Sequence, residues 1–345
     1  MATIPNLTHH PVLPSHMRAL VLTDAGPVVR TDVPVPKPGR DEALIQVHLA
    51  GVCATDLQLV RGYKGGFRGV LGHEFVGTVA AAPGHEEWLG RRVVGEINAG
   101  CGECALCKEG LANHCPTRRA LGITTWNGAF ADYLSMPVAN LYHVPPALPD
   151  EQAVFTEPLA AALRILEQVH VGPDSRVYVL GDGRLGNLTA QALARTGCDL
   201  TVIGRHPEKL ALLQRLGIAT AVAANPADMT GLLAQPAHVV VDATGTPGGI
   251  ETALSLVRPT GTVVLKTTVS EPLERFDLSQ LAVDEVRILG SRCGPFAPAL
   301  RLLAAGAIIT APLIHARFGL DDGVAALEQA GQRGVLKVLI EMEQG

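Results

Sequence analysis

Residues 176–186 read RVYVLGDGRLG and join a short apolar run to a turn with glycine at positions 181, 183 and 186. The spacing Gly-x-Gly-x-x-Gly between a predicted strand and a predicted helix is typical of a dinucleotide-binding turn. Glycines there let the backbone approach a pyrophosphate, which lies on the helix N-terminus, where free N–H groups attract negative charge. Because such a motif is weak when it stands alone, the neighbouring sequence decides its value.

The neighbouring sequence alternates short apolar runs with helical stretches from about residue 150 onward. A helix is expected over 151–170, because apolar residues recur there at helical spacing. Further strands are expected over 176–181, 199–204, 237–245 and 261–266, and further helices over 188–195, 208–216 and 250–257. This alternation predicts a parallel sheet covered by helices on both faces, an α/β fold.

The chain before residue 150 has a different pattern. Residues 17–26 and 42–53 alternate apolar and polar side chains, as half-buried strands do, with Gly, Pro and Asp clusters between them. Residues 1–16 are polar and proline-broken, and we expect a flexible N-terminal extension there. A chain of 345 residues is long enough for two cores. The sequence therefore predicts a β-rich domain followed by an α/β domain.

Composition excludes several classes of partner. The formal net charge is −5, so no overall positive field attracts nucleic acid or an anionic membrane surface. No stretch reaches the ~18 uninterrupted apolar residues of a spanning helix, and no secretion signal is evident, so we expect a cytoplasmic protein. Because cytosolic thiols stay reduced, the seven cysteines point to metal rather than to disulfides.

Four of these cysteines, at positions 101, 104, 107 and 115, lie within a lobe that we place at residues 98–117. Thiolates suit tetrahedral zinc, and four of them close a coordination sphere with no position open for substrate. The spacing therefore predicts a structural zinc ion, and an iron–sulfur cluster is the alternative.

A second metal site is indicated by Cys53 in GVCATD and by His73 and Glu74 in GHEFVG. A thiolate and an imidazole could bind one zinc and leave room for a mobile fourth group, the open arrangement that catalysis requires. A lone cysteine and a lone histidine, however, are more often buried structural residues.

The two motifs, the cysteine lobe and the glycine-rich turn, in this order and at these separations, resemble the zinc-dependent medium-chain dehydrogenase/reductase superfamily. That superfamily includes alcohol, polyol and threonine dehydrogenases. The resemblance runs from Met17 to the end of the chain. It implies a GroES-like, β-rich catalytic domain over 17–155 and 292–345, and a Rossmann domain with a doubly wound parallel sheet over 156–291.

The resemblance also implies roles for single residues at the metal. Cys53 and His73 become ligands of a catalytic zinc, with Glu74 beside the metal. FTEPLA, residues 155–160, matches the polyol and threonine dehydrogenase branch. It makes Glu157 the candidate fourth ligand, directly or through water.

Two more residues of GVCATD gain a role in the same way. Asp56 fits the carboxylate that orients the zinc-bound histidine, and Thr55 fits the hydroxyl that takes the proton of the substrate. The chain departs from many relatives at Gln58, where they have a histidine that passes this proton to solvent. Glutamine cannot titrate, so the sequence leaves the proton exit open.

The cofactor expected is NADP(H) rather than NAD(H). An NAD site usually has a carboxylate at the end of the second strand, but Gly204 and Arg205 stand there. Gly204 leaves room for a 2′-phosphate, which Arg205 can bind. Lys337 resembles a basic residue that relatives direct at the pyrophosphate. The cofactor-binding candidates are Gly181, Asp182, Gly183, Arg184, Leu185, Gly186, Gly204, Arg205 and Lys337.

The function expected is that of an alcohol dehydrogenase-like oxidoreductase with two zinc ions per chain, which transfers a hydride between a nicotinamide cofactor and an alcohol or carbonyl. The expected substrate is a small-molecule alcohol or carbonyl, with a polyol or an amino alcohol as candidates, and a homodimer or homotetramer is favoured. The alternatives are a zinc-free quinone or enoyl reductase of the same superfamily and a non-catalytic NADPH-binding sensor. The sequence leaves the substrate and the direction of the reaction open.

Overall fold

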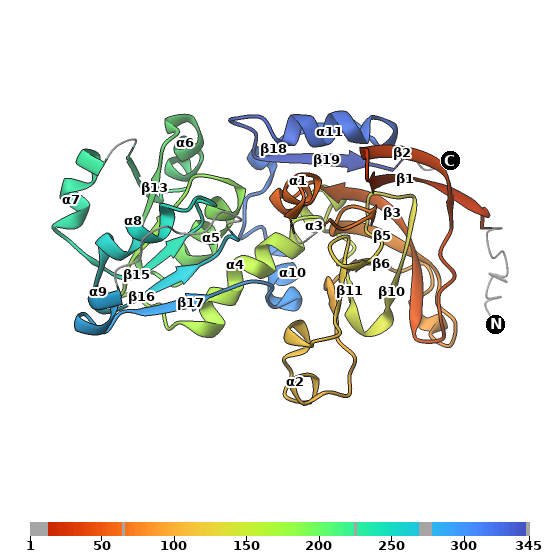
Figure 1. Ribbon diagram of the computed structural model, residues 1–345, viewed down its shortest axis with the longest axis horizontal. Coiled ribbons are helices and arrows are strands. Elements are labelled where there is room, and N and C mark those ends of the chain that lie inside the picture. Colours follow the sequence, from red (N-terminus) through yellow and green to blue (C-terminus); the bar gives the residue numbers. More distant parts are fainter. Residues whose placement is uncertain (1–12, 64–65, 224–225, 269–277, 343–345) are drawn as a thin grey trace, which may run out of the picture.

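The computed structural model describes residues 13–63, 66–223, 226–268 and 278–342 (Figure 1). Most of the expected N-terminal extension, residues 1–12, lies outside the described residues. Its last member, His16, already pairs with Pro34 in a strand. No helix in the described ranges has both the length and the apolar content needed to cross a bilayer.

The β-rich part of the molecule is built from strands of both ends of the chain. These strands are β1 (His16–Thr23), β2 (Gly26–Pro34), β3 (Glu42–Gly51), β4 (Gly69–Val70), β5 (Glu74–Ala81), β6 (Arg92–Gly95), β7 (Asn98–Ala99), β8 (Arg119–Leu121), β9 (Thr125–Trp126), β10 (Tyr133–Pro137), β11 (Leu141–His143), β18 (Ile314–Gly319) and β19 (Lys337–Glu341).

The largest sheet of this part has the order β11-β6-β5-β3-β19-β18, and β10 also pairs with β3. β3 lies antiparallel to both β5 and β19, so residues near 51, 74 and 339 are neighbours. Figure 1 shows this return of the blue C-terminal strands beside the red N-terminal ones. The C-terminal segment thus completes the sheet of the first half.

The second part of the molecule is a six-stranded parallel sheet in the described residues. Its strands are β12 (Arg176–Leu180), β13 (Asp199–Gly204), β14 (Ala219–Val222), β15 (Ala237–Asp242), β16 (Val257–Leu265) and β17 (Arg287–Gly290). Their order, β14-β13-β12-β15-β16-β17, is the doubly wound order of dinucleotide-binding sheets. The order reverses beside β12, and ligands bind such sheets in the crevice at that point.

Helices cover both faces of this sheet, with α5 and α6 on one face and α8 on the other, and further helices lie in the β-rich part and between the two parts. The helices are α1 (Ala54–Val60), α2 (Ala105–Lys108), α3 (Asp150–Ala153), α4 (Thr156–Gln168), α5 (Arg184–Ala194), α6 (Pro207–Arg215), α7 (Thr230–Leu233), α8 (Gly249–Leu256), α9 (Leu278–Val283), α10 (Phe296–Ala304) and α11 (Gly323–Ala330). The predicted fold class, a β-rich domain and a doubly wound α/β domain, is confirmed.

Alternate side chains of the central strand enter two different cores. Val177 and Val179 of β12 pack with α5 and α6, whereas Tyr178 and Leu180 pack with α8. A strand that is apolar on both faces needs helices on both faces, which is why its apolar run is nearly continuous. A third core joins the two domains, because Phe155 and Leu159 of the α4 region pack with Leu339 of β19.

Gly186 is the tightest point of the glycine-rich turn. A β-carbon on Gly186 would lie 2.0 Å from the carbonyl oxygen of Gly181, whereas one on Gly183 would meet no heavy atom within 4 Å. We expect Gly186→Ala to lower the free energy of unfolding by about 1–3 kcal/mol, because added atoms must displace packed backbone. Urea unfolding followed by circular dichroism measures this.

Gly183→Ala is the matched control for this variant, since it adds the same methyl group in the same turn. Its effect on the free energy of unfolding should stay within about 0.5 kcal/mol. Equal losses in both variants would contradict the close packing at Gly186.

Candidate active site

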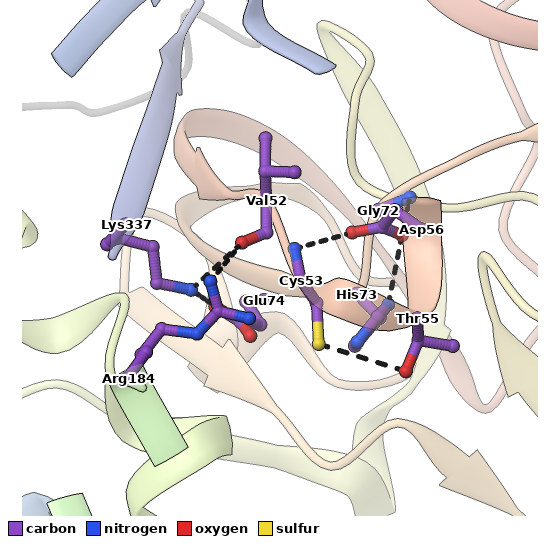
Figure 2. Close-up of polar contacts among 9 residues, drawn as sticks. All are labelled: Val52, Cys53, Thr55, Asp56, Gly72, His73, Glu74, Arg184 and Lys337. Atoms are coloured by element: carbon purple, nitrogen blue, oxygen red, sulfur yellow. Dashed lines mark hydrogen bonds and ion pairs between the residues drawn. The ribbon is translucent and has the colours of Figure 1, made fainter. Parts of the chain in front are cut away.

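Cys53, His73 and Glu74 meet because two paired strands end beside one another. Cys53 follows β3 and precedes α1, and His73 directly precedes β5. Since Gly51 of β3 pairs with Glu74 of β5, the two segments leave the sheet side by side. One ligand atom from each of the three residues lies within 4.8 Å of the others. Figure 2 shows Cys53 next to His73, with Glu74 on the side of Lys337 and Arg184.

The Asp56 carboxylate holds both segments of this cluster in place. It is fully buried. Its Oδ2 accepts a hydrogen bond of 2.8 Å from the backbone N–H of Cys53, and its Oδ1 accepts one of 3.3 Å from Gly72. Oδ1 also lies 3.3 Å from Nδ1 of His73. Removal of this carboxylate would therefore free the backbone on both sides and the imidazole.

Thr55 and Gln58 lie on α1 beside the cluster. The Cys53 thiol and the Thr55 hydroxyl are 3.8 Å apart (Figure 2). The Gln58 amide donates a hydrogen bond of 3.3 Å to the carbonyl oxygen of Thr268, and the Thr268 hydroxyl donates one of 3.4 Å back to it. Gln58 thus connects the two domains.

Glu74 forms a buried ion pair with Lys337 through Oε2 (Figure 2). Both side chains have no exposed surface. Burial alone would raise the pKa of Glu74, but the charges of Lys337 and Arg184 outweigh it and lower that pKa below the usual value. The other carboxylate oxygen, Oε1, is buried without a hydrogen-bond partner, as expected of an atom available to a metal ion.

Lys337 and Arg184 point to this cluster rather than to the cleft of the glycine-rich turn. The Lys337 amine also donates to the carbonyl oxygen of Val52, at 3.3 Å. The Arg184 guanidinium donates to the carbonyl oxygens of Val52 and Leu336, at 2.9 and 3.0 Å. The resemblance implies a pyrophosphate contact for Lys337, whereas the structure gives its amine a protein carboxylate as partner.

Glu157 lies in the first turn of α4, close enough to the cluster for its charge to interact with His73 and Glu74. Burial is the main cause that raises its pKa to about 7. Among the described residues, the compact group of possible metal ligands at this place contains Cys53, His73 and Glu74 and leaves Glu157 out. Thiolate, imidazole and carboxylate are all donors that zinc accepts, so the cluster fits this metal with Glu157 nearby.

The second metal-ligand group is the cysteine lobe around α2, which projects from the β-rich domain in Figure 1. Its four sulfur atoms lie within 4.8 Å of one another, and all four thiols are free. A hydrogen bond with the Thr117 hydroxyl is the main cause that lowers the pKa of Cys115 to about 6. This group fits a four-thiolate zinc ion.

The cleft at the carboxyl ends of β12, β13 and β15 has a volume of about 570 Å³. Gly181 has a φ of 111° there, and a β-carbon on it would lie 2.7 Å from the carbonyl oxygen of Ala243. The open space beside Gly183 lets a ligand reach the backbone at the start of α5. The cleft therefore suits a dinucleotide.

The residues predicted to bind the cofactor divide between this cleft and its surroundings. Those that line it are Gly181, Asp182, Gly183, Gly204 and Arg205. Arg184, Leu185, Gly186 and Lys337 are not among the lining residues. His206 and Lys209 also line it and were missed. His206 lies two residues and Lys209 five residues after the predicted strand 199–204, and this position near the strand end is the signal that could have found them.

Comparison with known proteins adds to this geometry. Residues 39–146 match the alcohol dehydrogenase GroES-like domain, and residues 185–305 match the zinc-binding dehydrogenase domain. D-altritol 5-dehydrogenase of Agrobacterium fabrum is 30% identical over 319 residues, which cover 89% of this chain and 94% of that protein.

Two solved structures share the fold over nearly the whole chain. A protein from Sinorhizobium meliloti 1021 bound to NADP has a TM-score of 0.86 and 29% identity, covering 95% of this chain and 100% of the other. An alcohol dehydrogenase from Escherichia coli CFT073 in complex with NADH has a TM-score of 0.86 and 26% identity, with the same coverage.

The buried ion pair makes a prediction about stability. We expect Lys337→Met to lower the free energy of unfolding by about 3–5 kcal/mol, because it leaves the Glu74 carboxylate buried without its partner. Thermal and urea unfolding measure the loss.

Arg317→Met is the control, since Arg317 pairs with Glu341 and Glu151 at the surface, with 43% of its side chain exposed. The free energy of unfolding of Arg317→Met should be lower than that of wild type by about 1 kcal/mol or less. A Lys337→Met variant as stable as Arg317→Met would show that the buried charge is compensated by other groups.

Proposed function

The chain belongs to the zinc-type medium-chain dehydrogenase/reductase family, in its polyol dehydrogenase branch, and we propose from this and from its site that it interconverts a polyol or amino alcohol and the corresponding carbonyl. The observation that carries the proposal is the cluster of Cys53, His73 and Glu74 in a protein that also has a dinucleotide cleft. Alcohol-type oxidoreductase activity with a nicotinamide cofactor is common to the family. The substrate and the ligand roles below are our proposal.

Two zinc ions per chain form part of the proposal. Cys53 and His73 would hold the catalytic ion, with Glu74 or Glu157 as the further ligand, and Cys101, Cys104, Cys107 and Cys115 would hold the structural one. The donor types in the two groups support this assignment. They oppose the zinc-free reductase, which has no need of either group, and an open metal site beside a hydroxyl opposes the non-catalytic sensor.

When bound, zinc would polarise the substrate oxygen and nicotinamide would exchange a hydride with the carbon that carries it. The residues of the chain would accept the proton and orient the metal ligands. The Thr55 hydroxyl accepts the proton of the substrate alcohol, while Asp56 keeps His73 in one orientation. Gln58 donates a hydrogen bond to the backbone of Thr268 in the other domain. Because its amide does not titrate, the onward transfer of the proton falls to water, the cofactor or another residue.

A polyhydroxyl substrate is favoured because D-altritol 5-dehydrogenase resembles this chain over 89% of its length. For the cofactor, the proposal extends to a nicotinamide dinucleotide in the cleft; the sequence favours NADP(H), and the cationic Arg205 and Lys209 both line the cleft. The Asp182 carboxylate in the same cleft opposes NADP(H). The homodimer or homotetramer favoured by the sequence stays a prediction.

Metal analysis tests the proposal at the two ligand groups. We expect two zinc ions per wild-type chain by mass spectrometry of the acid-digested protein, and one in Cys53→Ser, because that variant loses a ligand of the catalytic site only. Its kcat should fall by more than the roughly 10–100-fold seen when outer partners of metal ligands are changed.

Cys198→Ser is the control for this experiment, because Cys198 is a partly buried free thiol of the other domain. It should retain both ions and near wild-type kcat with polyols such as altritol and sorbitol. A Cys53→Ser variant with full zinc content and activity would contradict the catalytic role of the cluster.

Thr55 supplies a second test of the proposal. We expect Thr55→Val to lower kcat by about 10²–10⁴-fold, because the variant keeps the shape of the side chain and loses the proton acceptor. Thr55→Ser retains the hydroxyl and should stay within about tenfold of wild type. Stopped-flow measurement of hydride transfer gives both rates, and equal rates for Val and Ser would show that the hydroxyl takes no part.

A further inference from the structure

Asp182 is an acidic residue inside the glycine-rich turn, between Gly181 and Gly183. Its side chain is only 9% exposed. Oδ2 accepts hydrogen bonds of 2.7 and 2.8 Å from the backbone N–H groups of Arg205 and His206. Both of those amides follow β13, the strand next to β12. The carboxylate therefore links the end of β12 to the end of β13 by hydrogen bonds.

The third donor to this carboxylate is the His206 ring. Nδ1 of His206 lies 3.1 Å from Oδ1 and 3.0 Å from Oδ2 of Asp182. The Arg333 guanidinium can only donate, and its Nε bonds to Nε2 of His206 at 3.4 Å. Nε2 is therefore an acceptor, so Nδ1 carries the proton and donates it to Asp182. Three donors fix the carboxylate, and Oδ1 keeps free acceptor capacity.

Asp182 also fills the space beside Gly204. A β-carbon on Gly204 would lie 2.6 Å from both Cβ and Oδ2 of Asp182. An aspartate or glutamate at position 204, where NAD sites usually have one, would therefore occupy the region that the Asp182 carboxylate already holds. The Asp182 side chain thus occupies the room that Gly204 was expected to leave for a 2′-phosphate.

The backbone amides after β13 lead to the same conclusion. Free N–H groups are what a bound phosphate needs, but those of Arg205 and His206 already donate to Asp182. The Arg205 side chain is exposed, so it remains in water without a phosphate. A 2′-phosphate would thus meet a fixed carboxylate, and only mobile cations could offset the repulsion.

We propose that Asp182 selects the cofactor: its carboxylate accepts hydrogen bonds from the adenosine ribose hydroxyls of NAD(H) and repels the 2′-phosphate of NADP(H). The inference rests on the proposed function, since it needs a nicotinamide dinucleotide in this cleft. This proposal reverses the preference for NADP(H) that Gly204 and Arg205 predict. The carboxylate that NAD sites usually have after the second strand is here supplied by Asp182 of the glycine-rich turn.

Fluorescence titration of the zinc-loaded protein with NADH and with NADPH, in the absence of any alcohol, tests this proposal. We expect wild type to bind NADH at least about tenfold more tightly than NADPH, in keeping with hydrogen bonds to a charged group. Asp182→Asn keeps the shape and removes the charge. It should weaken NADH about tenfold and leave NADPH unchanged or tighter.

The control variant is Asp199→Asn, which removes the same charge at the other end of β13, where Asp199 pairs with Arg176. Its two dissociation constants should match those of wild type. Wild-type protein that binds NADPH as tightly as NADH would overturn the proposal. So would an Asp182→Asn variant that weakens both cofactors equally, because that pattern belongs to a residue that only supports the turn.

The same titration separates this inference from the proposed function. If both cofactors bind and NADPH binds more tightly, only the role of Asp182 is wrong. If neither binds to wild type, the proposed function and this inference are both wrong.

Discussion

The buried ion pair between Glu74 and Lys337 joins the N-terminal half of the chain to its C-terminal segment at the candidate active site. β3 pairs with β5 on one side and with β19 on the other. This pairing brings the Glu74 carboxylate and the Lys337 amine together at a place where neither side chain is exposed to solvent. Burying two charges is costly, and their attraction compensates only when the geometry is good. Compared with two apolar side chains of similar volume, the pair therefore adds little to the free energy of unfolding, although the loss of one partner alone is costly. Its effect is to keep the Glu74 carboxylate ionised and fixed beside Cys53 and His73.

The same place is also where the two domains are joined. Arg184, the first residue of α5, donates to the carbonyl oxygens of Val52 and Leu336 in the β-rich domain. The core around Phe155 and Leu339 continues from one domain into the other. These contacts connect the glycine-rich turn to the Cys53 segment. They therefore fix the position of the cleft relative to the metal-ligand cluster.

Much of the fold could be predicted because its signals are local. The glycine-rich turn, the alternating strands and helices, and the close spacing of the four lobe cysteines are all readable within short windows. The cluster of Cys53 and His73 depends on the pairing of β3 with β5. No short window holds that pairing, so only the resemblance to a family decided between a shared metal site and two buried structural residues.

The features that escaped prediction are contacts between segments distant in sequence. Lys337 and Glu74 are 263 positions apart, and nothing near either residue indicates its partner. Asp182 was placed in the turn by its position, but its bonds to Arg205 and His206 depend on how two neighbouring strands end. Gly204 predicts room for a phosphate, but the side chain of Asp182, from the turn after the neighbouring strand β12, fills that space.

The hydrogen bonds between Gln58 and Thr268 have a consequence for how the enzyme responds to acidity. They span the two domains, and neither an amide nor a hydroxyl changes charge near neutrality. An imidazole at position 58 would gain a proton in mildly acidic solution and alter this bridge. With glutamine, the strength of these hydrogen bonds between the two domains stays constant as acidity varies.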